Sequence, residues 1–416
     1  MDFLKKLLDG VAVEWKALGD LGAFIRGNGM QKKDFVVSGF PAIHYGQIYT
    51  KYGLSADKTF VYVSEELAKK LKKAKKNDLL LATTSENDND VVKPLAWLGS
   101  EVVMSGDMML FRHSQNVKYL AYFFQTEAFQ EQKRKYITGA KVRRVSSGDL
   151  AKIFAPIPCP ENPKKSLEIQ AEIVRILDAF TELTAELTAE LTARKKQYSY
   201  YRDQLFGFEE NEVDCLSLGH PDVGEFIRGG GLQKKDFTES GVGCIHYGQI
   251  YTHYGVYAKN TKTFVSEEFF KKARKAQTGD LVIATTSEND EDVCKAVAWL
   301  GVEKIAVSSD ACIYRHKLNP KYVSYFFQTE DFQKQKRPYI TGTKVRRVNA
   351  DDLAKLLIPV PSPKEQARIV SILDKFDALT NSLTEGLPRE IELRQKQYEY
   401  YRDLLLSFPK PGTVEV

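Results

Sequence analysis

The sequence contains few of the residues that bind structural metals or form disulfide frameworks. Its 416 residues include five cysteines, an odd number, and six histidines. No two cysteines form a C-x-x-C pair, and no histidine pair at zinc-ligand spacing stands beside them; they are Cys159, Cys215, Cys244, Cys294 and Cys312. The sequence therefore argues against a structural zinc site and against a disulfide-stapled fold.

Long apolar runs are also missing. No stretch approaches the roughly 18 consecutive apolar residues of a transmembrane helix. The N-terminus places Asp2 second and interrupts its apolar residues with Lys5 and Lys6, which makes a poor secretory signal. We therefore expect a cytoplasmic chain with no membrane partner. At about 150 residues per domain, the length predicts two or three domains.

The common signatures of catalysis are missing as well. The sequence has no G-x-x-x-x-G-K-[ST] loop, no G-x-S-x-G elbow and no Asn/Asp-Pro-Pro-aromatic loop of an amino-methyltransferase. Two glycine-rich pieces, residues 26–29 and 228–231, lack the G-x-G-x-x-G spacing and are typical of tight loops. We therefore predict no catalytic residue and no metal site in this chain.

What the sequence does contain is a long internal repeat. Phe24–Phe35 returns with small changes as Phe226–Phe237, and Ile43–Thr50 returns unchanged as Ile245–Thr252. Further matches follow to the end of both halves. Solenoid repeats run to about 50 residues, and these copies are much longer, so they indicate a duplicated module.

Each copy has the pattern of a globular domain followed by a long helix. Short apolar runs such as Leu79–Ala82 alternate with turn residues and helical patterns, which is typical of an α+β domain. Proline clusters at 156–160 and 359–363 then predict a rigid exit from each domain. Behind each cluster, apolar residues recur at heptad spacing, over Ile169–Leu187 and over Ile369–Leu383.

The two apolar stripes are best buried against each other. An antiparallel pair fits, because each helix would then leave one domain and arrive at the other. We therefore predict an α+β fold in which two tandem-duplicated α/β domains are separated by two long helices that form an antiparallel coiled coil with pseudo-two-fold symmetry. Pro388 should kink the second helix or restart it. The expected boundaries are 1–160 and 209–363 for the domains, 161–208 and 364–408 for the helices, and 409–416 for a tail.

The net charge is +5, and its positive part lies in the two domains rather than in the helices. Two basic lobes favour contact with a polyanion such as double-stranded DNA. The alternative is a solvated lysine face, which fits the lysine-rich run at residues 69–76 well, as an exposed helix before a strand.

Three stretches of each copy combine cations, amides, hydroxyls and aromatic rings. Arginine can bond guanine, glutamine can read adenine, and lysine and threonine suit phosphates. The tyrosines could instead belong to the core, the threonines to turns, and the basic stretch to a segment that covers the core. The predicted DNA-contacting residues are Lys32, Lys33, Tyr45, Gln47, Thr84, Lys133, Arg134, Thr138, Lys141 and Arg143 in the first copy, and Lys234, Lys235, Tyr247, Gln249, Thr286, Lys336, Arg337, Thr341, Lys344 and Arg346 in the second.

Several features together resemble the specificity subunit of type I restriction–modification enzymes, over essentially the whole chain. They are the duplicated layout, the Ile-Pro-x-Pro exits, the segment Gln366–Asp374, the Arg-Gln-Lys-Gln-Tyr-Glu-Tyr-Tyr-Arg run at 394–402, and the tandem Thr-Ala-Glu-Leu at 184–191. The first exit departs from this pattern, because residues 161–166 are inserted before Gln170. A longer turn is expected there.

The resemblance implies two target-recognition domains, each reading one half of a bipartite DNA site. The helices would dock two methyltransferase subunits, and two motor/nuclease subunits could join them. This chain would then hold no cofactor, and S-adenosylmethionine, ATP and Mg²⁺ would belong to the partner subunits. The near-identity of the two domains predicts a near-palindromic site with a gap. A stand-alone repressor or architectural protein with the same two lobes remains the alternative.

Overall fold

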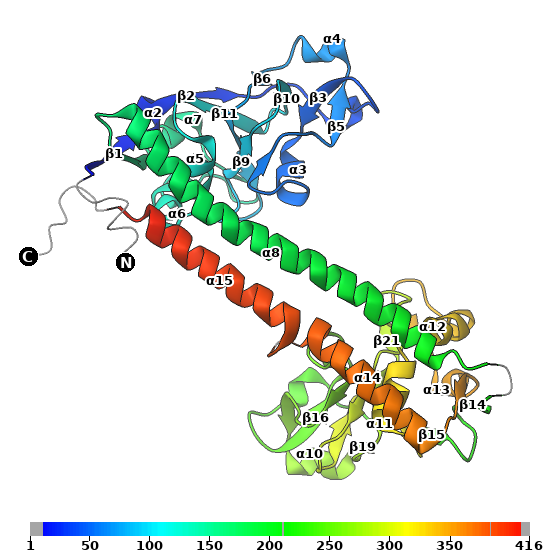
Figure 1. The fold of residues 1–416 in the computed structure, drawn as a ribbon. Coiled ribbons are helices and arrows are strands. Elements are labelled where there is room, and N and C mark those ends of the chain that lie inside the picture. The colour runs from blue at the N-terminus through cyan, green and yellow to red at the C-terminus, as the bar shows by residue number, and fades with distance from the viewer. Residues whose placement is uncertain (1–10, 210–211, 383, 409–416) are drawn as a thin grey trace, which may run out of the picture. The chain divides into compact units, whose positions relative to one another are not determined.

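The computed structural model describes residues 11–209, 212–382 and 384–408 (Figure 1). The N-terminal residues 1–10, the predicted tail 409–416 and Leu383 of the predicted heptad seam lie outside the described residues. By its contacts the chain divides into two compact units. One is formed by the chain up to Glu186 together with the chain from Glu392, and the other by Leu187–Ile391.

A five-stranded sheet forms the centre of the first domain. In spatial order its strands are β2 (Gly22–Arg26), β11 (Met108–His113), β7 (Leu79–Ala82), β9 (Lys93–Trp97) and β4 (Ser55–Ala56), and only the β4–β9 pair is parallel. Because side chains alternate along a strand, the apolar run of β7 fills two cores. Leu79 and Leu81 face the core under helix α5 (Val117–Phe123), and Leu80 and Ala82 face the core under α3 (Tyr45–Thr50).

A smaller four-stranded sheet and two short ladders complete this domain. The sheet runs β5 (Val61–Val63), β3 (Phe40–Ile43), β10 (Val102–Met104) and β6 (Lys73–Ala74), with β3 and β10 parallel. The ladders pair β1 (Val13–Ala17) with β13 (Phe154–Pro158) and β8 (Thr84–Ser85) with β12 (Arg143–Arg144). The remaining helices are α2 (Leu18–Leu21), η1 (Lys32–Asp34), α4 (Glu65–Ala68), α6 (Glu127–Arg134) and α7 (Ser147–Leu150).

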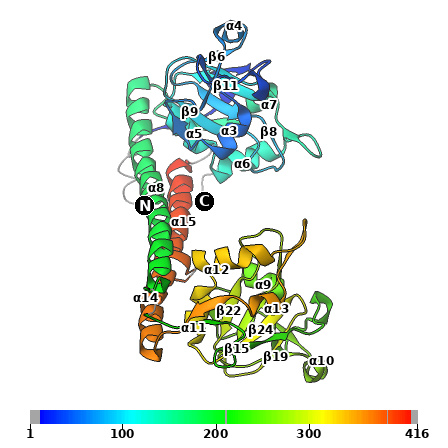
Figure 2. The same cartoon turned by 90° about the vertical axis from the view of Figure 1, so that its right-hand side faces the viewer.

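The second domain, which Figure 2 draws in green, yellow and orange, repeats this topology strand for strand. Its five-stranded sheet is β15 (Gly224–Arg228), β24 (Ala311–His316), β20 (Leu281–Ala284), β22 (Ala296–Trp299) and β17 (Tyr257–Ala258), and its four-stranded sheet is β18 (Thr263–Val265), β16 (Val242–Ile245), β23 (Ile305–Val307) and β19 (Lys275–Ala276). The ladders pair β14 (Cys215–Ser217) with β26 (Leu357–Pro359) and β21 (Thr286–Ser287) with β25 (Arg346–Arg347). Its short helices are η2 (Lys234–Asp236), α9 (Tyr247–Thr252), α10 (Glu267–Lys272), α11 (Pro320–Phe326), α12 (Glu330–Lys336), η3 (Arg337–Tyr339) and α13 (Ala350–Leu353).

A long helix follows each domain, as the heptad spacing predicts. The first, α8 (Pro163–Phe206), is continuous, whereas the second is broken into α14 (Pro363–Asn381) and α15 (Gly386–Leu406). The expected break near Pro388 is therefore confirmed. Pro388 lies in the first turn of α15, where a residue without an N–H costs no helical hydrogen bond, and Gly386 adopts the positive φ of 76° that begins the new helix.

Within each unit, segments of these helices pack side by side in opposite directions (Figure 1). In the first unit the rings of Phe180 and Tyr401 stack with their centroids 5.3 Å apart. In the second unit Phe376 stacks on Tyr198 and Tyr201, at 6.0 and 5.7 Å. The predicted fold class, with duplicated α/β domains and long antiparallel helices, is thus confirmed, while the domain boundaries given above stay predictions.

The same polar contacts fasten each domain to its helices. Asp178 of α8 accepts hydrogen bonds from Lys118 and Tyr122, both at 2.7 Å, and Asp374 of α14 accepts them from Lys321 and Tyr325. The other long helix of each unit, α15 in the first and α8 in the second, also binds the domain. Its aspartate accepts from the first N–H of a short domain helix, in the pairs Asp403–Glu127 at 3.1 Å and Asp203–Glu330 at 2.9 Å. Each domain is therefore held by both helices, as the antiparallel arrangement requires.

Candidate nucleic-acid interface

Three of the segments predicted to touch DNA lie together in the first domain. We call residues Glu86–Asp90 the acidic loop and residues Thr138–Arg144 the arm. The hydroxyl of Tyr49, on α3, lies 3.0 Å from the backbone oxygen of Thr84 and 3.2 Å from that of Asp90, at the two ends of the acidic loop. Burial raises the pKa of Tyr49, so the hydroxyl stays protonated and can donate to these oxygens. Helix α3 thus supports the loop from one side.

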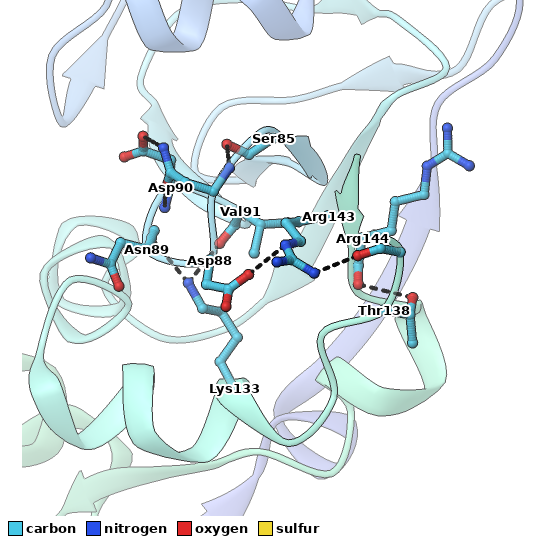
Figure 3. Close-up of polar contacts among 11 residues, drawn as sticks. Ser85, Asp88, Asn89, Asp90, Val91, Lys133, Thr138, Arg143 and Arg144 are labelled. Atoms are coloured by element: carbon cyan, nitrogen blue, oxygen red, sulfur yellow. Dashed lines mark hydrogen bonds and ion pairs between the residues drawn. The ribbon is translucent and has the colours of Figure 1, made fainter. Parts of the chain in front are cut away.

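The arm supports the acidic loop from another side. Strand β12 of the arm pairs with β8, which leads into the loop. Thr138 and Arg144 exchange backbone hydrogen bonds, both 2.9 Å long, which close the arm into a narrow turn. The guanidinium of Arg143 lies 2.8 Å from the carboxylate of Asp88 and donates to the Gly139 oxygen at 2.6 Å (Figure 3). The arm and the loop therefore form one surface with both basic and acidic groups.

The second domain builds the same surface. Tyr251 donates to the Thr286 oxygen at 2.7 Å, Arg346 lies 2.8 Å from Asp290, and Thr341 and Arg347 exchange the backbone bonds of the second arm. We call residues Glu288–Asp292 and Thr341–Arg347 the second acidic loop and the second arm. Because the copies share these contacts as well as their sequence, this surface is a property of the duplicated module.

Lys133 is not on the DNA-facing surface that the sequence predicted for it. Its side chain is fully buried, and its ammonium group donates to the backbone oxygens of Asn89 at 3.0 Å and Val91 at 2.8 Å (Figure 3). Burial lowers its pKa to about 8. Lys336 is buried in the same way and donates to the oxygens of Glu291 and Val293 at 3.2 and 2.7 Å. The predicted DNA contact is therefore wrong for this pair in the structure described, because the lysines hold the acidic loops instead.

Two other predicted pairs are mainly structural. Gln47 is buried and its side-chain oxygen accepts from the backbone N–H of His44 at 3.1 Å, which caps α3, and Gln249 caps α9 through His246 at 3.0 Å. Thr84 and Thr286 lie in β8 and β21 and are each 7% exposed. The base or phosphate contacts predicted for Gln47, Thr84 and Thr286 are corrected by this burial. Gln249 is half-buried, and its side-chain oxygen is engaged in the cap of α9. Tyr45 and Tyr247 are half-buried against the core, the alternative that the sequence left open.

The other predicted residues are exposed or half-exposed. Burial lowers the pKa of His44, the residue before α3, and the positive charge of Lys32 lowers it further. Arg134 forms an exposed ion pair with Glu127 at 2.9 Å. Most of the predicted cations and both arm threonines are thus exposed. Arg143 and Arg346 are half-buried in their ion pairs. The exposed residues are Lys32, Lys33, Arg134, Thr138, Lys141, Lys234, Lys235, Arg337, Thr341 and Lys344.

Sequence reasoning missed two kinds of residue. Arg144 and Arg347 are exposed on the arms beside the predicted Arg143 and Arg346, and the Arg-Arg doublet was the available signal. The aspartates of the acidic loops were not among the predicted residues, although they pair with the arginines of the arms. The role of Asp88 depends on Arg143, which lies 55 residues later in the chain, so no local sequence signal indicated it.

The chemistry of this surface is that of recognition. Arginine and lysine side chains can bind phosphates or guanine, and carboxylates and amides can accept from or donate to base edges. Among the described residues no group of histidine, cysteine, aspartate and glutamate could hold a metal ion. In the same ranges no helix is long and apolar enough to cross a membrane.

Two basic, duplicated α/β domains on long helices define a class of DNA-recognition proteins. Residues 11–194 and 220–393 both match the family described as the type I restriction modification DNA specificity domain. The chain belongs to this family, whose members are the non-catalytic DNA-recognition subunits of type I restriction–modification systems.

Curated relatives agree with this assignment, and solved structures share the fold. The chain is 36% identical to the EcoR124I/EcoR124II specificity subunit of Escherichia coli, over 100% of this chain and 99% of the relative. It is 31% identical to a putative specificity subunit of Haemophilus influenzae over 98% of both chains. Its fold matches a chain from a structural study of type I restriction–modification complex assembly, with TM-score 0.64, 14% identity and coverage of 95% and 97%. It also matches the crystal structure of the S subunit from M. genitalium, with TM-score 0.50, 13% identity and coverage of 97% and 98%.

Proposed function

We propose that this chain reads a split double-stranded DNA site, with one recognition domain on each half, and directs a methyltransferase to that site. The observation that carries the proposal is the surface built twice. The Arg143–Asp88 and Arg346–Asp290 pairs are both 2.8 Å long, and each stands beside an exposed arm that carries further cations. One basic reading surface per domain is what a bipartite site requires.

The two halves of the site should be nearly alike. The exposed residues of the arms and acidic loops are almost identical in the two domains. Similar side chains in similar frames make similar hydrogen bonds to base edges. If the two domains face the DNA across a pseudo-two-fold axis, their half-sites form a near-palindrome with a gap that the protein does not read.

The long helices offer a surface for the methyltransferase subunits. Most apolar residues of the seam are covered, but Tyr200 and Tyr400 are 61% and 64% exposed, at equivalent positions of α8 and α15. Exposed aromatic residues are frequent anchors of protein–protein interfaces. Two such positions fit two methyltransferase subunits, one per half-site, and two motor/nuclease subunits could join that assembly.

The cofactors of the reaction belong to those partners in this proposal. The chain lacks the motifs that bind ATP or carry out amino-methyl transfer. S-adenosylmethionine would therefore be bound by the methyltransferase, and ATP with Mg²⁺ by the motor subunit. A DNA-reading role also fits the cytoplasmic location expected from the sequence.

A map of methylated bases tests the proposal. The chain is expressed with its candidate methyltransferase, and the genome is compared with that of cells carrying the methyltransferase alone. A split, near-palindromic motif that is methylated only when this chain is present supports the proposal. No chain-dependent methylation beside an active methyltransferase would refute it and favour a stand-alone DNA-binding protein.

A further inference from the structure

The two acidic loops are framed by the same contacts but differ at one exposed position. From Thr84 to Val91 the first copy matches Thr286–Val293 at every residue except Asn89, where the second copy has Glu291. Both residues are exposed, at the fourth position of their five-residue loops. In Figure 3 the side chain of Asn89 points away from the Arg143–Asp88 pair.

The backbone at this position is fixed in both domains. The backbone oxygens of Asn89 and Glu291 accept the hydrogen bonds of the buried lysines, at 3.0 and 3.2 Å. The flanking residues are bound as well, because Asn87 donates to Asp90 at 2.7 Å and Asn289 donates to Asp292 at 2.8 Å. A fixed backbone holds the side chain in one orientation, and base reading requires such a fixed orientation.

The difference also has a meaning in the chemistry of base recognition. An asparagine amide can both accept from N6 and donate to N7 of adenine, whereas a glutamate carboxylate only accepts and suits the N4 amino group of cytosine. Among the residues of the two loops, this substitution alone changes the hydrogen-bonding character of an exposed side chain.

We propose that Asn89 and Glu291 are specificity-determining residues, which make the two half-sites differ at one base pair. Asn89 reads an adenine in the half-site of the first domain. Glu291 reads a cytosine at the equivalent place in the other half. This inference rests on the proposed function, because it presumes that each domain reads one half of a split site.

Exchanging the two residues tests the inference. The methylated motif is mapped for the wild-type chain, for Glu291→Asn, for Asn89→Glu and for the double exchange, each expressed with the methyltransferase. At one equivalent position, the wild-type motif should have an A·T pair in the half-site of the first domain and a C·G pair in the half-site of the second. Glu291→Asn should convert that C·G pair to A·T and make the two halves alike there, Asn89→Glu should do the reverse, and the double exchange should swap the two half-sites.

A matched control separates base reading from any change of exposed surface. Val302 is 89% exposed, differs from its counterpart Ser100, and lies beyond the end of β22 that is farther from the second acidic loop. Val302→Ser should leave every base of the motif as it is. If Val302→Ser shifts the motif as the exchanges do, the inference is overturned, because the shift then does not come from base reading by the acidic loops.

The failures of the two proposals can be told apart. If the wild-type chain directs no methylation, the proposed function fails. If it directs a split motif and the halves are identical, or if neither exchange shifts the motif, the inference about Asn89 and Glu291 fails alone. Loss of methylation at every sequence in both exchanges, with the complex still assembled, would also overturn it, because a reading residue changes only one position.

Discussion

The ammonium group of Lys133 is bonded to the backbone oxygen of Val91 at 2.8 Å inside the first domain, 42 residues away along the chain. This contact and its partner at Asn89 connect helix α6 to the end of the acidic loop. Val92, next in the chain, has a positive φ of 71°, a strained conformation for a β-branched residue. Lys133 therefore stabilises a loop whose backbone conformation at Val92 is unfavourable.

Replacing this lysine should destabilise the domain. Lys133→Met keeps most of the buried apolar stem but leaves two carbonyl oxygens without their donor, which costs about 1–3 kcal/mol. The midpoint of thermal or urea unfolding should fall. The neighbouring Arg134→Met is the control, because Arg134 is exposed and its ion pair with Glu127 is worth little. Equal effects of the two substitutions would contradict the role assigned to Lys133.

The stability of the protein should fall on mild acidification through His113 and His316, which have buried ring nitrogens. Burial lowers the pKa of His113 and of His316 to about 4 in the folded state, against 6.5 for a free histidine. Between these values the unfolded chain binds protons that the folded chain does not. Stability is therefore full above about pH 6.5 and is lost as the pH falls toward 4, by up to about 3 kcal/mol for each histidine.

Unfolding measured across pH 4–7 checks this dependence. In the double variant His113→Asn with His316→Asn the slope of stability against pH in this window should be flatter than in the wild type, because neither replacement titrates there. His113→Asn keeps a side-chain acceptor for the hydrogen bond that the backbone N–H of Gln115 donates to the imidazole at 3.1 Å. An unchanged slope would assign the acid sensitivity to other groups.

The sequence predicted the fold better than the individual contacts. Repetition and heptad spacing are properties of long segments, so the duplicated domains, the antiparallel helices and the break near Pro388 could all be inferred. The burial of Lys133 could not, because its sequence neighbours are those of an exposed lysine and its partners lie in a distant loop. The capping role of Gln47 was easier to predict from the sequence, because His44 and Gln47 stand at the spacing of a capping box. A glutamine at this position suggested base reading, but its side chain caps the start of α3 instead.

Lysines on the two arms should contribute to DNA binding without regard to sequence. Lys141 and Lys344 are exposed near the tips of the arms, and lysine typically binds phosphate as a point charge. Lys141→Ala or Lys344→Ala should weaken binding to all sequences and reduce the slope of log K against log salt by about 1 for each lost phosphate contact. Titrations at several salt concentrations with cognate and unrelated duplexes measure both effects. An unchanged slope would exclude a phosphate contact at these lysines.

The tandem Thr-Ala-Glu-Leu of α8 should set the length of the gap between the half-sites. Deleting residues 188–191 shortens the helix by about 6 Å, at 1.5 Å per residue. The deletion rotates the two ends by only about 40°, because four residues make slightly more than one turn, so the seam stays on the same side. Since DNA rises about 3.4 Å per base pair, the gap in the methylated motif should shorten by roughly one or two base pairs while both half-sites stay the same. Inserting a third copy should lengthen the gap by the same amount. A gap that stays constant in both variants, with methylation retained, would show that the helices do not measure the distance between the half-sites.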